Sequence, residues 1–149
     1  MIQDSNFNLT FLVDQSPAEV FEAVKNVRGW WSENLEGGSE ELNDEFIYRH
    51  GSFHYSKHKL TEVIPFQKFV WLTIDSKLTF VEKQNEWNGT EMIFEISKEG
   101  GQTKLKITHL GLIPDFQCFE GCSKGWTHYL KNSLLPLITK GKGIPDPKK

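Results

Sequence analysis

The chain has 149 residues and a formal net charge of −3, with 25% charged and 38% hydrophobic residues, the composition of one ordinary globular domain. Basic and acidic residues are interspersed, which excludes an electrostatic footprint for nucleic acid or an anionic membrane surface. No apolar run approaches the ~18 residues that span a bilayer, and the N-terminus lacks the features of a signal peptide. Two cysteines do not make a disulfide framework, so we expect a cytoplasmic protein without stable membrane insertion.

The first residues predict one strand followed by two short helices. Period-two alternation over Phe7–Val13 is typical of a half-buried strand. Ser16-Pro17-Ala18-Glu19 then reads as a capping box with proline at the first helical position, beginning a helix that runs to about Asn26. A second short helix over Val27–Glu33 contains the pair Trp30-Trp31.

Strand patterning returns after a loop that Gly37-Gly38-Ser39 opens. Segment Ser76–Gly89 is ambiguous, because Leu78–Val81 has strand character and Gln84–Gly89 reads as a turn. Tight turns between the remaining segments favour an antiparallel meander. The predicted strands are Glu45–His50, Phe53–Val63, Lys68–Asp75, Glu91–Ser97 and Lys104–Leu110.

The stretch Asp115–Gly141 predicts one long amphipathic helix, which at about 25 residues and ~1.5 Å per residue would extend ~38 Å, enough to cross a sheet. Pro136 falls inside this pattern and should kink the helix or end its regular stretch. The tail Gly141–Lys149 is expected to fray. The buried stripe comprises Phe119, Cys122, Ser123, Trp126, Leu130, Ser133, Leu134 and Leu137, opposite Lys124, His128, Lys131 and Thr139.

Several short motifs in this order resemble the single-domain members of the activator-of-Hsp90-ATPase homologue family, within the START-like (SRPBCC) superfamily. The resemblance covers nearly the whole chain. It implies an α+β helix-grip (Bet v1-like) fold, in which a curved antiparallel sheet of about six or seven strands wraps around a long C-terminal helix, with a hydrophobic cavity between them. The motifs are Ser16–Phe21, Trp30-Trp31, Glu86–Glu91, Thr108–Leu112, Gly125–Leu130 and Gly141–Gly143.

The aromatic content is high, with eleven Phe, five Trp and three Tyr, and ligand pockets are mostly apolar with a few placed polar groups. With the resemblance, we expect these side chains to wall a cavity between helix and sheet; without it, burial in an ordinary core is the simpler interpretation. The expected ligand-binding residues are Trp30, Trp31, Trp71, Phe80, His109, Phe119, Cys122, Ser123, Trp126 and Ser133.

The spacing of His50, His54 and His58 would place three imidazoles on one face of a helix, as in a zinc site. The surrounding pattern predicts a hairpin instead, and His54 and His58 would then lie ~13 Å apart along a strand. We therefore expect no metal site and no cofactor. Cys118 and Cys122, one helical turn apart, are too far apart for an undistorted disulfide and are expected to pack.

No nucleophile elbow, phosphate loop or dinucleotide motif is present in the sequence. The leading hypothesis is a non-enzymatic domain that binds a small apolar or amphipathic ligand. The second is a cochaperone-like interaction module; because the chain begins directly with the first strand, without the separate N-terminal domain of the chaperone activators, we do not expect ATPase stimulation. The third is a cavity enzyme, such as a cyclase or hydrolase, that would use His109.

Overall fold

The computed structural model describes residues 6–114 and 116–146. Over these residues the chain forms seven strands, four α-helices and one π-helical segment; two of the helices follow the first strand and two follow the last. In chain order these are β1 (Phe7–Val13), α1 (Pro17–Lys25), α2 (Val27–Trp30), β2 (Glu36–Gly37), β3 (Glu45–His50), β4 (His54–Ile64), β5 (Lys68–Leu78), β6 (Glu91–Glu99), β7 (Gln102–Leu110), α3 (Phe119–Tyr129), the π segment (Leu130–Leu134) and α4 (Leu135–Lys140).

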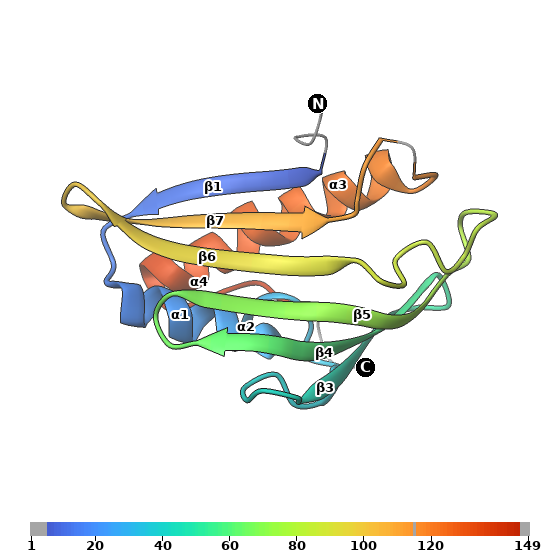
Figure 1. The fold of residues 1–149 in the computed structure, drawn as a ribbon, viewed down its shortest axis with the longest axis horizontal. Coiled ribbons are helices and arrows are strands. Elements are labelled where there is room, and N and C mark those ends of the chain that lie inside the picture. Colours follow the sequence, from blue (N-terminus) through green and yellow to red (C-terminus); the bar gives the residue numbers. More distant parts are fainter. Residues whose placement is uncertain (1–5, 115, 147–149) are drawn as a thin grey trace.

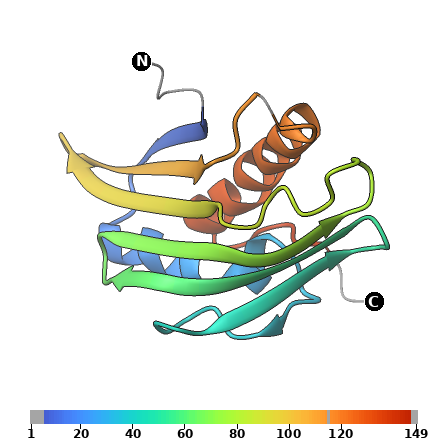
Figure 2. The same ribbon diagram turned by 45° about the vertical axis from the view of Figure 1, so that its right-hand side comes forward.

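The strands of the described chain form one antiparallel sheet in the order β1-β7-β6-β5-β4-β3-β2. Strands β3 to β7 follow one another as a meander, and β1 pairs with β7 from Phe7 opposite His109 to Val13 opposite Thr103. One face of the curved sheet carries α1, α2 and the long C-terminal helix, which crosses the strands obliquely (Figures 1 and 2). The predicted α+β helix-grip fold is therefore confirmed.

Local sequence signals account for most element boundaries. The capping box of α1 is present: Ser16 Oγ accepts the backbone N–H of Glu19 at 3.1 Å, and the Glu19 carboxylate accepts the N–H of Ser16 at 2.9 Å. Three predictions differ from the structure. The second helix ends at Trp30 rather than Glu33, β5 extends through Leu78, and the two-residue strand β2 pairs with β3 where a loop was expected.

The long helix begins at Phe119; the predicted start, Asp115, lies outside the described residues. The N-cap residue, Cys118, makes no side-chain capping bond. The buried carboxylate of Glu86 instead binds the two residues that lead into the helix, accepting the N–H groups of Gln117 at 2.8 Å and Cys118 at 3.2 Å. A carboxylate at this position also interacts favourably with the helix dipole.

The helix is not regular throughout. The α-helical bonding of α3 ends at Tyr129, the π segment follows, and Pro136, which has no N–H to donate, is the second residue of α4. The regular stretch is thus interrupted as predicted, though one turn before the proline. Along the predicted stripe, Phe119, Ser123 and Leu137 are half-buried and the other residues are buried.

The predicted fraying of the tail from Gly141 does not hold for residues 141–146; residues 147–149 lie outside the described part of the chain. Gly141 ends α4 with a positive φ of 81°. Ile144 N–H then donates to Ser133 Oγ at 2.7 Å, and Asp146 N–H donates to the Trp31 carbonyl at 3.0 Å. These bonds join the tail to the π segment and to the residue after α2. The hydrophobic pattern of the sequence did not predict these hydrogen bonds.

Among the described residues, no helix combines the length and the apolar character needed to cross a membrane.

Ser133 provides a test of this junction. Its hydroxyl is buried, donates to the Trp30 carbonyl at 2.6 Å and accepts from Ile144 N–H. Ser133→Ala leaves both groups unpaired and should lower the free energy of unfolding by about 1–3 kcal/mol. Chemical denaturation measures this loss. Thr139→Ala removes an exposed hydroxyl from the same helix and should change stability by less than about 0.5 kcal/mol; equal effects of the two substitutions would contradict the assignment.

Candidate functional site

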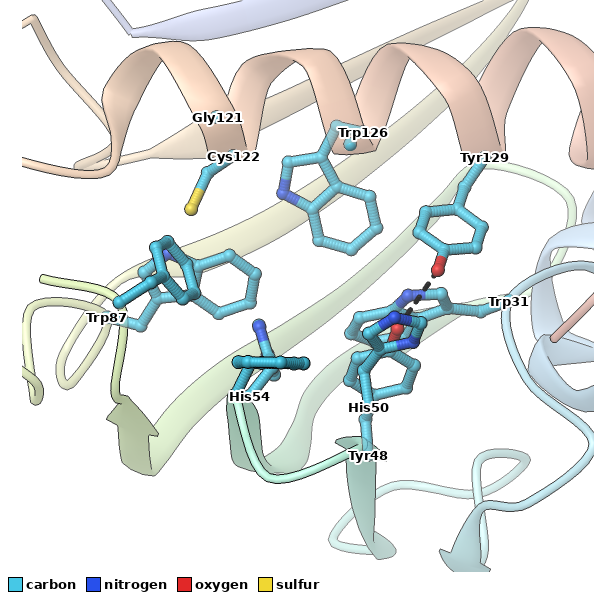
Figure 3. Close-up of a pocket in the computed structure, with 12 residues that line it drawn as sticks. Trp31, Tyr48, His50, His54, Trp87, Gly121, Cys122, Trp126 and Tyr129 are labelled. Carbon is cyan, nitrogen blue, oxygen red and sulfur yellow. Dashed lines mark hydrogen bonds between the residues drawn. The ribbon is translucent and has the colours of Figure 1, made fainter. Parts of the chain in front are cut away.

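A pocket of about 180 Å³ lies between α3 and the sheet, at the end of the gap where α3 begins (Figure 3). Its lining residues come from the end of α2, from β3 and β4, from the loop between β5 and β6, and from α3. They are Trp31, Tyr48, His50, Phe53, His54, Phe80, Trp87, Gly121, Cys122, Gly125, Trp126 and Tyr129. Phe53 and Phe80 are more than half exposed, at 58% and 51%, so they lie at the mouth of the pocket.

Two glycines open the helical side of the pocket. Gly121 and Gly125 are one turn apart on α3, and a Cβ atom added to either would meet no atom within 4 Å. Cys122 and Trp126 project from the same face of the helix toward the sheet, and Tyr129 follows one turn later (Figure 3). Because glycine is unfavourable inside a helix, this pair maintains free volume at a cost in helix stability.

A stack of tryptophans fills the rest of the space between helix and sheet. The Trp31 ring lies 4.8 Å from Trp126 of α3 and 5.9 Å from Trp71 of β5, with the second pair nearly parallel. Trp30 also stacks on Trp71, with the two ring centroids 6.4 Å apart. These centroid distances are those of favourable aromatic pairs. The pocket therefore ends where the stack begins.

The loop between β5 and β6 supplies the opposite wall. Trp87 stacks on Trp126 at 5.9 Å and meets His54 edge-on at 4.7 Å. Its position depends on the preceding residue, Glu86, whose carboxylate holds the first turn of α3. The same interaction thus caps the helix and positions an aromatic wall of the pocket.

The remaining end of the pocket is polar. Tyr48 and Tyr129 both donate to Asp146 Oδ2, at 3.0 and 2.7 Å, and their oxygens lie 3.1 Å apart. His50 Nδ1 lies 3.2 Å from the same carboxylate oxygen. Burial raises the pKa of Tyr129 to about 12, and burial together with the contact to Tyr129 raises the pKa of Tyr48 further. Both phenols are therefore neutral hydrogen-bond donors.

A histidine network extends from His54 on the pocket wall to His58, which is buried beneath it. Ser56 Oγ contacts His54 Nε2 at 2.9 Å and His58 Nε2 at 2.8 Å, and Thr73 Oγ1 contacts His58 Nδ1 at 3.1 Å. The ring nitrogens therefore come closer than the backbone spacing predicted. Burial lowers the pKa of His54 to about 3 and that of His58 well below the usual value.

His109 lies in the core with both ring nitrogens engaged. Trp126 Nε1–H donates to its Nδ1 at 2.9 Å, which places the ring proton on Nε2. That nitrogen is 2.8 Å from Thr90 Oγ1, whose own proton goes to the Trp87 carbonyl at 2.7 Å. Burial lowers the pKa of His109 to about 3. Its geometry is that of a residue that orients Trp126 and Trp87.

Of the ten residues that the sequence predicts for the site, the structure places four on the pocket wall: Trp31, Phe80, Cys122 and Trp126. Trp30, Trp71, His109 and Ser133 are buried outside its lining, and Phe119 and Ser123 are half-buried and also outside it. Cys118 and Cys122 are buried free thiols. The hydrogen bond between them, with burial, raises the pKa of Cys122.

Sequence reasoning missed eight lining residues: Tyr48, His50, Phe53, His54, Trp87, Gly121, Gly125 and Tyr129. The one-turn spacing of Gly121 and Gly125 beside Cys122 and Trp126 was a usable signal for two of them. Trp87 was hidden in a segment with the composition of a turn, and nothing in the pattern joins Asp146 to the tyrosines.

The three histidines considered as zinc ligands occupy different environments. His50 faces Asp146, His54 lies on the pocket wall, and His58 is buried beneath it. Within the described chain, no group of three or more His, Cys, Asp or Glu side chains could hold a metal ion.

No known protein-family profile matches the chain, and no curated protein matches it in sequence. Solved structures do match its fold. An Aha1 dimer from Colwellia psychrerythraea is 21% identical, with a TM-score of 0.73 over 96% of this chain and all of that chain. DynU16, a protein of the dynemicin biosynthetic locus, is 15% identical with a TM-score of 0.68 over 97% of this chain and 51% of its own. CalU16 from Micromonospora echinospora is 15% identical with a TM-score of 0.61, covering 88% and 73% of the two chains.

These similarities show that the chain has the Aha1-like helix-grip fold that the motifs implied.

The buried histidines predict a pH dependence of stability. In the unfolded chain each ring takes up a proton below about pH 6.5, whereas folded His54 and His109 stay neutral to about pH 3. Protons then favour the unfolded state, so each ring should cost about 1.4 kcal/mol of stability per pH unit below about pH 6.5. Denaturation at several pH values measures the slope. NMR signals of either ring that titrate near pH ~6.5 in the folded protein would contradict the assignment.

Proposed function

We propose that this protein binds a small, mainly apolar ligand in the aromatic pocket between α3 and the sheet. The observation that supports this most directly is the free volume of about 180 Å³ between layers that are otherwise packed with rings. An apolar cavity of about 150 Å³ can hold benzene, so the size fits a ligand with one aromatic ring or a small fused pair. Ring surfaces on several sides would provide most of the binding free energy.

The mouth of the pocket supports reversible binding. Phe53 and Phe80 lie on neighbouring turns, which are joined because Thr79 N–H donates to the Phe53 carbonyl at 2.9 Å. Both rings are exposed while the inner wall residues Trp31, Trp87 and Trp126 are buried. A ligand could thus pass between the two phenylalanines without opening the tryptophan stack.

Filling the pocket from the helix tests this proposal. In Gly125→Leu, the new side chain begins where a Cβ atom meets no neighbour and extends into the pocket. Isothermal titration with indole should show binding to the wild-type protein and at least about tenfold weaker binding to the variant. The variant should not lose thermal stability, because leucine is favoured over glycine in a helix by about 1 kcal/mol.

Lys124→Leu is the matched control, since it adds the same side chain to an exposed position beside Gly125. Its affinity for indole should equal that of the wild type. Undiminished binding to Gly125→Leu, or no binding to the wild type, would contradict the proposal.

A second candidate is a protein-interaction module of the cochaperone kind. It is favoured by the exposed pair Phe53 and Phe80 together with the fold shared with an Aha1 protein that forms a dimer. Sedimentation of the protein alone, and a chaperone ATPase assay in its presence, would distinguish this function from ligand binding. Loss of either effect in Phe53→Ser/Phe80→Ser would assign it to the mouth of the pocket.

A further inference from the structure

At the polar end of the pocket, the hydroxyl hydrogen atoms of the two tyrosines already form hydrogen bonds within the protein. A tyrosine hydroxyl has one hydrogen and a carboxylate only accepts. Tyr48 and Tyr129 therefore give their hydrogens to Asp146, and the contact of His50 Nδ1 with the same oxygen requires that this nitrogen donates as well. What remains unpaired on the two hydroxyls is oxygen lone pairs. This end offers a ligand acceptors rather than donors.

Among the described lining residues, only His50 makes an ion-pair contact, at 3.2 Å from the Asp146 carboxylate. None of the described lining residues is lysine or arginine, so no fixed cation is available to an anionic ligand. Burial keeps the pKa of His54 at about 3, and the hydrogen bond to Cys118 raises the pKa of Cys122, so both wall residues are neutral. Asp146 supplies a carboxylate directly behind the two tyrosines.

Aromatic side chains form much of the pocket wall around this polar end. Trp31, Trp126 and Trp87 line the pocket, and Tyr48 stacks on Trp31 with centroids 4.0 Å apart. In Figure 3 these rings and Tyr129 surround the space beside the two tyrosine hydroxyls, which a dashed line joins. The electron-rich faces of tryptophan and tyrosine attract ammonium groups within about 6 Å of the ring centroid, more strongly when water is excluded.

We propose that the pocket selects a small organic cation, a protonated or quaternary amine on an apolar body, whose charged group lies among the rings on the Asp146 side. This inference rests on the proposed ligand-binding function and narrows it to one class. The apolar body would occupy the space beside Gly121 and Gly125. A carboxylate ligand of the same size, with its charged group at this end, would meet the hydroxyl oxygen lone pairs and the negative charge of Asp146.

Three probes of similar shape test the charge preference: phenethylamine, phenethyl alcohol and phenylacetate, each titrated calorimetrically into the wild-type protein at neutral pH. The amine should bind on the order of fivefold or more tighter than the alcohol, and phenylacetate should bind least. Equal affinity for the amine and the alcohol would overturn the cation preference and leave the proposed function standing. Tightest binding of phenylacetate would overturn it as well. Failure of all three probes to bind would refute both proposals.

Asp146→Asn tests the source of the preference. The backbone bonds that anchor residue 146 to Trp31 and Glu33 remain available in the variant. The ratio of amine to alcohol affinity should fall toward one, while the affinity for the alcohol stays within about twofold. Asp75→Asn is the matched control, because Asp75 also accepts from a tyrosine, Tyr55, at an exposed site outside the pocket lining. An unchanged ratio in Asp146→Asn, or an equal fall in Asp75→Asn, would refute the role of Asp146, whereas the wild-type series decides the preference without either variant.

Discussion

The stacking of Trp31 against rings from both layers is the interaction on which the rest of the structure depends. Its indole lies between Trp126 of the long helix and Trp71 of the sheet, and it also stacks on Tyr48 of β3. Rigid rings of this size set the separation of helix and sheet, because close-packed interiors do not deform continuously. The layers consequently meet on the stack, and the space beyond it, where glycines replace large side chains on α3, is left open.

Two irregular segments convert that space into a pocket, and buried polar groups position both. Glu86 joins the loop between β5 and β6 to the first turn of α3 and so places Trp87 against Trp126. At the other end, Asp146 of the tail accepts from Tyr48 and Tyr129 while its backbone bonds to the residue after α2. A carboxylate that accepts hydrogen bonds in this way, buried at Glu86 and half-buried at Asp146, gives directional contacts that apolar packing cannot provide. The regular elements thus supply the frame, and the segments between them supply the polar contacts on which the proposed selectivity depends.

Periodicity explains why the fold could be predicted from the sequence while the site was predicted only in part. Alternation and the helical stripe identify which face of an element is buried, so the strands, the capping box of α1 and the inward position of Trp126 followed directly. Periodicity does not say whether a buried side chain meets protein or free volume. Trp71 and Ser133 share the inward face with Cys122 but lie outside the pocket. Trp87 and Asp146 lie in segments without periodicity, and their roles depend on contacts with distant parts of the chain, such as that between Tyr48 and Asp146.

If free volume at one end of the stack is the basis of the proposed function, the location of a bound probe tests this most directly. Unlabelled indole can be added to ¹⁵N-labelled protein while NMR records the five tryptophan Nε1–H signals. The signals of Trp31, Trp87 and Trp126 should shift and saturate together, because these rings line the pocket, whereas those of Trp30 and Trp71 should move little. Shifts centred on Trp30 and Trp71, or no saturable shift at any tryptophan, would contradict the account.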